Sequence, residues 1–128
     1  MSSEISILAL YGLIVMITIL AQVLAASGQV GLSMLAKARE DMPPLIGVAG
    51  RLDRAQINSI FALALFAPAV LALHAQGGSN PSTLLAAQIF LFARVLYTLF
   101  YAVGTPWLRT GAWIVAFLST GYLYVMAL

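Results

Sequence analysis

Four long apolar stretches, separated by short polar connections, constrain this chain more than any other feature. A helix needs about 20 predominantly apolar residues to cross a bilayer, and each stretch is long enough to do so. The sequence predicts helices at about residues 5–38, 52–75, 82–103 and 108–127. Because 62% of the 128 residues are hydrophobic and 8% are charged, little remains for a soluble part. We therefore expect one domain over residues 1–128, an all-α bundle of four transmembrane helices.

Proline residues help to locate the connections and a kink among the predicted helices. The first predicted helix is the longest, because its helical pattern continues through Gly28 toward Ala38. Pro43 and Pro44 then interrupt the chain in the first connection. Pro68 lies inside the second stretch, where it predicts a kink rather than an end.

The basic residues are distributed unevenly among the connections. Those in or beside the first and third connections are Lys37, Arg39, Arg51, Arg54 and Arg109, and the second connection has none. Lys and Arg concentrate in cytoplasmic loops of membrane proteins. We therefore expect both termini on the non-cytoplasmic side. The net charge of +2 comes from so few groups that it carries no information about nucleic acid, and we expect no nucleic-acid partner.

Metal and cysteine chemistry find no support in the sequence. The chain has no cysteine and one histidine, His74. A cysteine nucleophile and thiolate metal sites are therefore excluded. His74 has no second ligand at metal spacing and is best explained as a surface residue. We expect no metal site.

Arg94 is the residue most in need of an explanation, because it lies within an apolar stretch. A cation near the bilayer centre costs about 2.5–3.5 kcal/mol on insertion scales. The four acidic residues all lie at or outside the predicted membrane ends; they are Glu4, Glu40, Asp41 and Asp53. We infer that Arg94 faces a protein interior or a water-filled cavity and can receive an anion from outside its own chain.

Two tyrosines share a helical face with this arginine. Tyr97 and Tyr101 follow Arg94 at intervals of three and seven residues, which places the three side chains in successive turns. A guanidinium pairs with a carboxylate or phosphate, and a phenol can donate to an anion. The alternative is that protein carbonyls or a neighbouring subunit satisfy the arginine, and that Tyr101 is an interfacial residue.

Further polar residues gather at the same end of the predicted bundle. Arg54 and Asn58 lie four residues apart on the second helix, and Arg109 and Thr110 open the fourth. We expect Arg54, Asn58 and Arg109 to share the cytoplasmic half with Tyr101. The alternative for each arginine alone is a headgroup anchor.

These residues resemble the motifs of the MAPEG family, the membrane-associated proteins in eicosanoid and glutathione metabolism. The similar segments are Arg54-Ala55-Gln56-Ile57-Asn58, Arg94-x-x-Tyr97-x-x-x-Tyr101 and Arg109-Thr110. The resemblance implies a homotrimer that binds glutathione between subunits, toward the cytoplasmic face, with a lipophilic substrate entering from the membrane lipids. It assigns catalysis to Arg109 and Tyr101, and ligand binding to Arg54, Asn58, Arg94, Tyr97 and Thr110.

Two positions depart from the family pattern. Phe61 stands where the second-helix motif has a glutamate, and Gly31 stands where some members have an arginine. An apolar side chain beside cations better suits an anionic amphiphile than a zwitterionic peptide. Three interpretations stay open: a glutathione-dependent transferase or peroxidase, a non-catalytic lipid-binding or accessory subunit with a heterologous membrane partner, and a small transporter or channel element.

Overall fold

The computed structural model describes residues 3–40 and 42–128, and five helices account for most of them. The helices are α1 (Glu4–Val30), α2 (Leu32–Ala36), α3 (Gly47–Gln76), α4 (Pro81–Val103) and α5 (Pro106–Ala127). All except α2 are long and apolar enough to cross a membrane. The prediction of an all-α protein with four membrane-spanning helices is confirmed.

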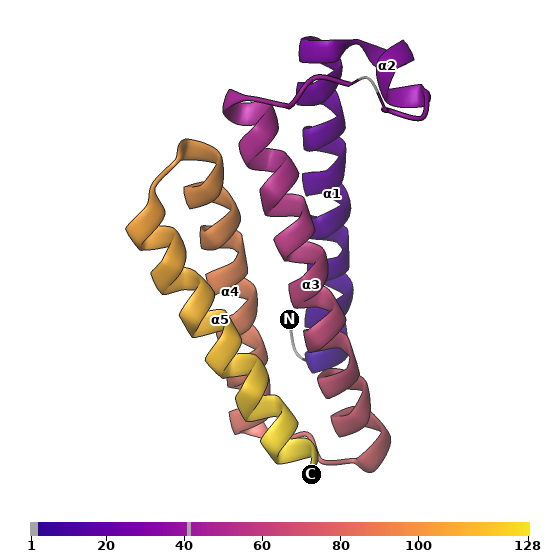
Figure 1. Ribbon diagram of the computed structural model, residues 1–128. Coiled ribbons are helices and arrows are strands. Elements are labelled where there is room, and N and C mark those ends of the chain that lie inside the picture. The colour runs from indigo at the N-terminus through magenta and orange to yellow at the C-terminus, as the bar shows by residue number, and fades with distance from the viewer. Residues whose placement is uncertain (1–2, 41) are drawn as a thin grey trace.

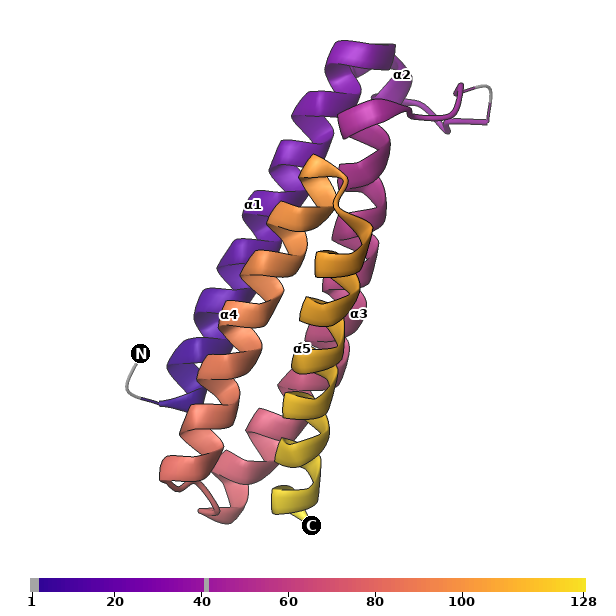
Figure 2. The same cartoon turned by 90° about the vertical axis from the view of Figure 1, so that its left-hand side faces the viewer.

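The four long helices alternate in direction and pack as two pairs. In Figures 1 and 2, α1 lies beside α3 and α4 lies beside α5. Helix α3 also contacts α4 and α5, and α1 contacts α4. Helix α1 begins in the half of the bundle where α5 ends (Figure 1). Helices α3 and α4 thus each contact all three of the other long helices.

The predicted end of the first helix is wrong. Helix α1 ends at Val30, because Gly31 has φ +86° and ψ 152°, a backbone conformation that favours glycine. Its N–H still donates to the Ser27 carbonyl, at 2.9 Å, and this bond closes the last turn. The apolar pattern continues across the break into α2, so hydropathy alone could not reveal it. Helix α3, in turn, begins before the predicted residue 52, and it continues through Pro68.

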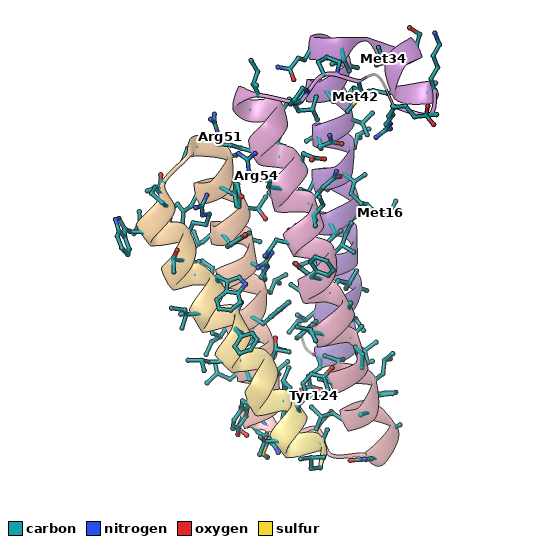
Figure 3. The ribbon with its side chains drawn as sticks, in the orientation of Figure 1. Met16, Met34, Met42, Arg51, Arg54 and Tyr124 are labelled. Carbon is teal, nitrogen blue, oxygen red and sulfur yellow. The ribbon has the colours of Figure 1, made fainter. Side chains whose placement is uncertain are left out.

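Aromatic rings join three of the long helices at the centre of the bundle. Phe66 of α3 and Phe90 of α4 stack with ring centroids 3.9 Å apart. Tyr11 of α1 meets Phe90 edge to face at 5.0 Å. All three rings are almost completely buried. Large apolar side chains such as Met16 point outward instead (Figure 3), as expected of a surface that faces lipid.

One end of the bundle collects the basic side chains. This basic end holds the segment between α1 and α3 and the turn between α4 and α5, and its cations are Lys37, Arg39, Arg51, Arg54 and Arg109. Arg51 donates from Nε to the Ala102 carbonyl at 3.0 Å, which ties the start of α3 to the last turn of α4. Figure 3 shows Arg51 and Arg54 at the end of α3 nearest this turn.

Candidate functional site

Arg94 lies in the interior of the bundle, where neutral groups surround it. Its guanidinium donates from Nε to the Tyr11 hydroxyl at 3.2 Å. It also donates to Asn58 Oδ1 at 2.9 Å and to Ser59 Oγ at 3.2 Å. The Tyr97 ring lies 4.1 Å from the guanidinium carbon, in cation–π contact. The side chain is 1% exposed, so α1, α3 and α4 together hold one buried cation.

The sequence missed two of these partners. Contacts of Tyr11 and Ser59 with Arg94 were not predicted. Two features of the sequence could have indicated them: Tyr11 places a phenol in the otherwise apolar first helix, and Ser59 places a hydroxyl next to Asn58. The Tyr11 hydroxyl also donates to the Ser59 carbonyl at 3.0 Å. The predicted partnership of Arg94 with an external anion stays a prediction, because the three acceptors found here are uncharged.

Tyr11→Phe is expected to destabilise the protein. The change removes the acceptor of Arg94 Nε and the donor to the Ser59 carbonyl, and an unsatisfied buried group costs about 1–3 kcal/mol. Thermal unfolding in detergent measures the effect. Tyr122→Phe is the matched control, because its hydroxyl bonds to Ser82 at a 40%-exposed position. Equal unfolding temperatures for the two variants would contradict this account of Arg94.

A cavity of about 170 Å³ adjoins Arg94 between α3, α4 and α5. Its lining residues are Asn58, Phe61, Ala62, Leu65, Phe90, Arg94, Trp113, Ala116, Phe117 and Thr120. Trp113 and Phe117 stack at 5.0 Å along one wall. Most of the wall is therefore apolar. Asn58 and Arg94 lie at the end nearer the basic residues, and Thr120, whose hydroxyl donates to the Ala116 carbonyl at 2.9 Å, lies farther along α5.

A second cluster forms around Tyr101, nearer the basic end. Arg54 of α3 donates from Nε to the Tyr101 hydroxyl at 3.2 Å. Arg109 of α5 lies over the same ring, with its guanidinium carbon 4.3 Å from the centroid. Tyr97 meets Tyr101 edge to face at 5.6 Å. Three helices thus place two guanidinium groups on one phenol.

The two clusters are joined along one face of α3. A second cavity, of about 190 Å³, is lined by Arg54, Ile57, Asn58, Phe61, Tyr97 and Tyr101. It shares Asn58 and Phe61 with the cavity at Arg94. The described residues that line the two cavities include arginines but no carboxylate. The two cavities thus adjoin at Asn58 and Phe61, and we call the cationic, partly apolar pair the α3 cleft.

Asp53 is the acidic residue nearest to the cleft along the chain, and its carboxylate contacts glutamine side chains outside the cleft. Asp53 Oδ1 accepts from Gln56 Nε2 at 3.0 Å and from Gln22 Nε2 of α1 at 3.4 Å. Asp53 therefore faces the α1 side of α3, whereas Arg54 faces Tyr101 of α4. Asp53 therefore does not line the α3 cleft, although it lines a neighbouring cavity together with Arg54.

The structure brings together six of the seven predicted site residues. Arg54, Asn58, Arg94, Tyr97 and Tyr101 line the α3 cleft, and Arg109 contacts the Tyr101 ring. Thr110 is the exception: it is exposed, and its hydroxyl donates to the Pro106 carbonyl of its own helix at 3.0 Å. The geometry therefore gives Thr110 no contact with the cleft.

A metal centre has no basis in the residues described. No group of three or more His, Asp or Glu side chains that could hold an ion occurs within residues 3–40 and 42–128. The charges that do converge are guanidinium groups, which recognise anions. Any ligand of the α3 cleft is therefore expected to carry a negative group.

The four long apolar helices are those of an integral membrane protein. Guanidinium and phenol groups line a cleft between three of these helices, so the protein has a polar site inside its bundle. The chain matches the MAPEG family over residues 5–128, and it belongs to this family. Searches of curated proteins and of solved structures gave no match.

Proposed function

We propose that this MAPEG protein binds glutathione in the α3 cleft and directs its thiol toward lipophilic electrophiles, as a transferase or peroxidase. The observation that carries the proposal is the convergence of Arg54 and Arg109 on Tyr101. Family membership supplies glutathione as the ligand, because the family is associated with glutathione metabolism. The apolar walls of the neighbouring cavity suit a lipophilic second substrate.

The residues around Tyr101 are arranged to favour an anion. Arg54 donates to the phenolic oxygen, so the Tyr101 hydroxyl hydrogen is still free to be donated to a ligand. Arg109 adds a positive charge on the ring face. A nearby cation lowers the pKa of a thiol and raises its thiolate fraction. As a transferase, bound glutathione would supply a thiolate that forms a C–S bond to an electrophilic carbon and displaces a leaving anion such as chloride, and its thiol proton would pass to solvent. As a peroxidase, the thiolate would attack a peroxide oxygen and break the O–O bond, which gives an alcohol and a sulfenic acid of glutathione. A second glutathione would then convert the sulfenic acid to a disulfide and water.

The fit between glutathione and the cleft is incomplete. Arg54 and Arg94 can pair with its two carboxylates, and the Asn58 side chain offers donors to an amide. Its amine has no carboxylate partner among the described lining residues. We therefore expect glutathione to bind, but more weakly than in a cleft that balances its cations with an acid.

Phe61 favours a second candidate function. Its ring is 64% exposed and lines both parts of the α3 cleft. A protein that holds an anionic amphiphile without transferring a group would use the same cations and the same apolar walls. In that case the chain acts as a lipid-binding or accessory subunit.

A homotrimer in a bacterial inner membrane, with the basic end toward the cytoplasm, completes the proposal. Arg54 and Phe61 are exposed in the single chain, so a neighbouring subunit could close the open side of the cleft. The basic residues at one end support the orientation through the positive-inside rule.

Titration calorimetry with glutathione in detergent tests the proposal. Arg54→Ala is expected to weaken binding about tenfold or more, because a charge-assisted hydrogen bond contributes about 1.5–3 kcal/mol. Lys37→Ala is the matched control, since it removes an exposed cation at the same end. Conjugation of glutathione to a chlorodinitrobenzene, followed by absorbance, tests the chemistry. Absent binding and absent conjugation would reject the enzyme and leave the amphiphile-binding candidate.

A further inference from the structure

A further cavity, of about 370 Å³, lies at the basic end between α1, α3 and the segment that joins them. We call it the loop cavity. Gln22 of α1, Asp53 of α3 and the segment 42–45 contribute to its wall. Figure 3 shows Met42, which lines it, at the same end of the bundle as Arg54. Arg54 is the one lining residue that the loop cavity shares with the α3 cleft.

Gln22 and Asp53 offer hydrogen-bond acceptors to the loop cavity. Gln22 Nε2 and Gln56 Nε2 both donate to Asp53 Oδ1, at 3.4 Å and 3.0 Å. Within residues 3–40 and 42–128, both bonds that reach this carboxylate end on the same oxygen, so Oδ2 remains as an acceptor. Gln22 uses its amide nitrogen here and keeps its oxygen, although the side chain is only 5% exposed. Because a buried acceptor needs a donor, these two oxygens favour a ligand that carries N–H groups.

The segment that closes the loop cavity is fixed to both neighbouring helices. The Gln29 side chain of α1 accepts from the Ile46 N–H at 3.1 Å and donates to the Ile46 carbonyl at 3.5 Å. On the α3 side, a Cβ atom at Gly50 would come within 2.7 Å of the Leu45 carbonyl oxygen. Glycine at this position therefore lets the backbone of the segment lie directly on α3. A wall that is held before the ligand arrives lowers the cost of binding.

Arg39 supplies a positive charge to the loop cavity. Its Nε donates to the Leu35 carbonyl at 3.0 Å, which leaves the two terminal nitrogens of the guanidinium to bind an anion. Arg39 is exposed, whereas Gln22 is buried, so the cation lies nearer to solvent than the amide does. Arg54 donates instead to Tyr101 of α4, and its charge is not needed in this cavity.

We propose that the loop cavity binds a small zwitterion, whose primary ammonium is held by Asp53 and Gln22 and whose phosphate pairs with Arg39. An ammonium has three N–H donors and no acceptor, which matches the two oxygens of the wall. A guanidinium pairs well with phosphate. The cavity volume exceeds severalfold the share of one water in the liquid, about 30 Å³, so both groups have room. The inference goes beyond the proposed function, because Asp53, Gln22 and Arg39 do not line the α3 cleft.

Titration calorimetry with phosphoethanolamine in detergent tests the proposal on the unchanged protein. We expect saturable binding. Phosphocholine has the same phosphate and the same positive charge but no N–H on its nitrogen. It should bind about tenfold more weakly or worse, because it cannot donate to Asp53 and Gln22. Ethanolamine without the phosphate should also bind about tenfold more weakly, because it loses the pairing with Arg39.

Asp53→Asn removes the charge of the wall and keeps a side-chain oxygen that can accept from Gln22 and Gln56. We expect it to weaken phosphoethanolamine about tenfold. Glu40→Gln is the matched control and should leave the affinity unchanged, since Glu40 is exposed and does not line the loop cavity. Thermal unfolding shows whether Asp53→Asn retains the fold. The comparison with phosphocholine needs no variant, so it decides the matter even if Asp53→Asn unfolds.

The same titration in lipid nanodiscs identifies the source of the ligand. If the head of a membrane lipid fills the cavity, phosphatidylethanolamine nanodiscs should abolish binding of added phosphoethanolamine, and phosphatidylcholine nanodiscs should retain it. Binding in both would assign the site to a soluble zwitterion.

Three results would overturn the proposal. They are no saturable binding in detergent, equal affinity for phosphoethanolamine and phosphocholine, and equal affinity of folded Asp53→Asn and Glu40→Gln. All these measurements omit glutathione, so a failure here leaves the conjugation assay of the proposed function unaffected.

Discussion

Arg109→Ala is expected to lower the rate of conjugation at saturating glutathione by about 10²–10³-fold, the usual loss when a positioned group that stabilises developing charge is removed. Arg109 lies 4.3 Å from the centre of the Tyr101 ring. Arg109 and Arg54, whose Nε donates to the Tyr101 hydroxyl at 3.2 Å, are the two cations beside the phenol that we expect to donate to the thiolate. Stopped-flow measurement of the bound thiolate, through its ultraviolet absorption, should show a smaller thiolate fraction in this variant.

Tyr101→Phe removes the hydroxyl and keeps the ring on which Arg109 lies, so it tests the role of the hydroxyl alone. It should lower the rate as well, while the ring still holds the guanidinium. Because the two residues are in contact, the double variant should be little slower than the slower single variant, as is common for groups that act as a unit. If Arg109→Ala binds glutathione and conjugates at the normal rate, the catalytic role of this cluster is wrong.

Proline and glycine residues near the ends of α4 and α5 explain why the predicted limits of these two helices lie close to the observed ones. Pro81 and Pro106 stand at the first positions of α4 and α5, where proline is tolerated. Gly104 ends α4 in a left-handed conformation. These residues act within one turn of the helix end, so the predicted ranges of 82–103 and 108–127 lie close to the observed bounds.

The end of α1 and the contacts of Arg94 could not be predicted in the same way. Gly31 leaves the helix although its neighbours continue an apolar pattern. Glycine can adopt φ +86° without steric cost, but the hydropathy pattern does not indicate where the chain uses this freedom. Helical spacing placed Arg94, Tyr97 and Tyr101 on one face, in agreement with their ring and cation contacts. The bond from Arg94 to Tyr11 joins residues 83 positions apart, and it depends on how α1 and α4 rotate against each other.

Phe61→Glu is expected to raise the affinity for glutathione about tenfold. The new carboxylate would lie in the α3 cleft, where Arg54 and Arg94 provide positive charge and the ligand amine has no acidic partner among the described lining residues. An ion pair that is partly removed from water can contribute on the order of 1.4 kcal/mol, or tenfold in affinity.

Phe61→Gln introduces a side chain with the shape of glutamate but without its charge. Calorimetry with glutathione on Phe61→Glu and Phe61→Gln therefore measures the effect of the charge on affinity. Only the glutamate should strengthen binding, and the gain should fall at high salt, because the exposed side of Phe61 admits screening ions. A folded Phe61→Glu protein with unchanged glutathione affinity would mean that the ligand amine does not approach this position. The placement of glutathione in the α3 cleft would then be wrong.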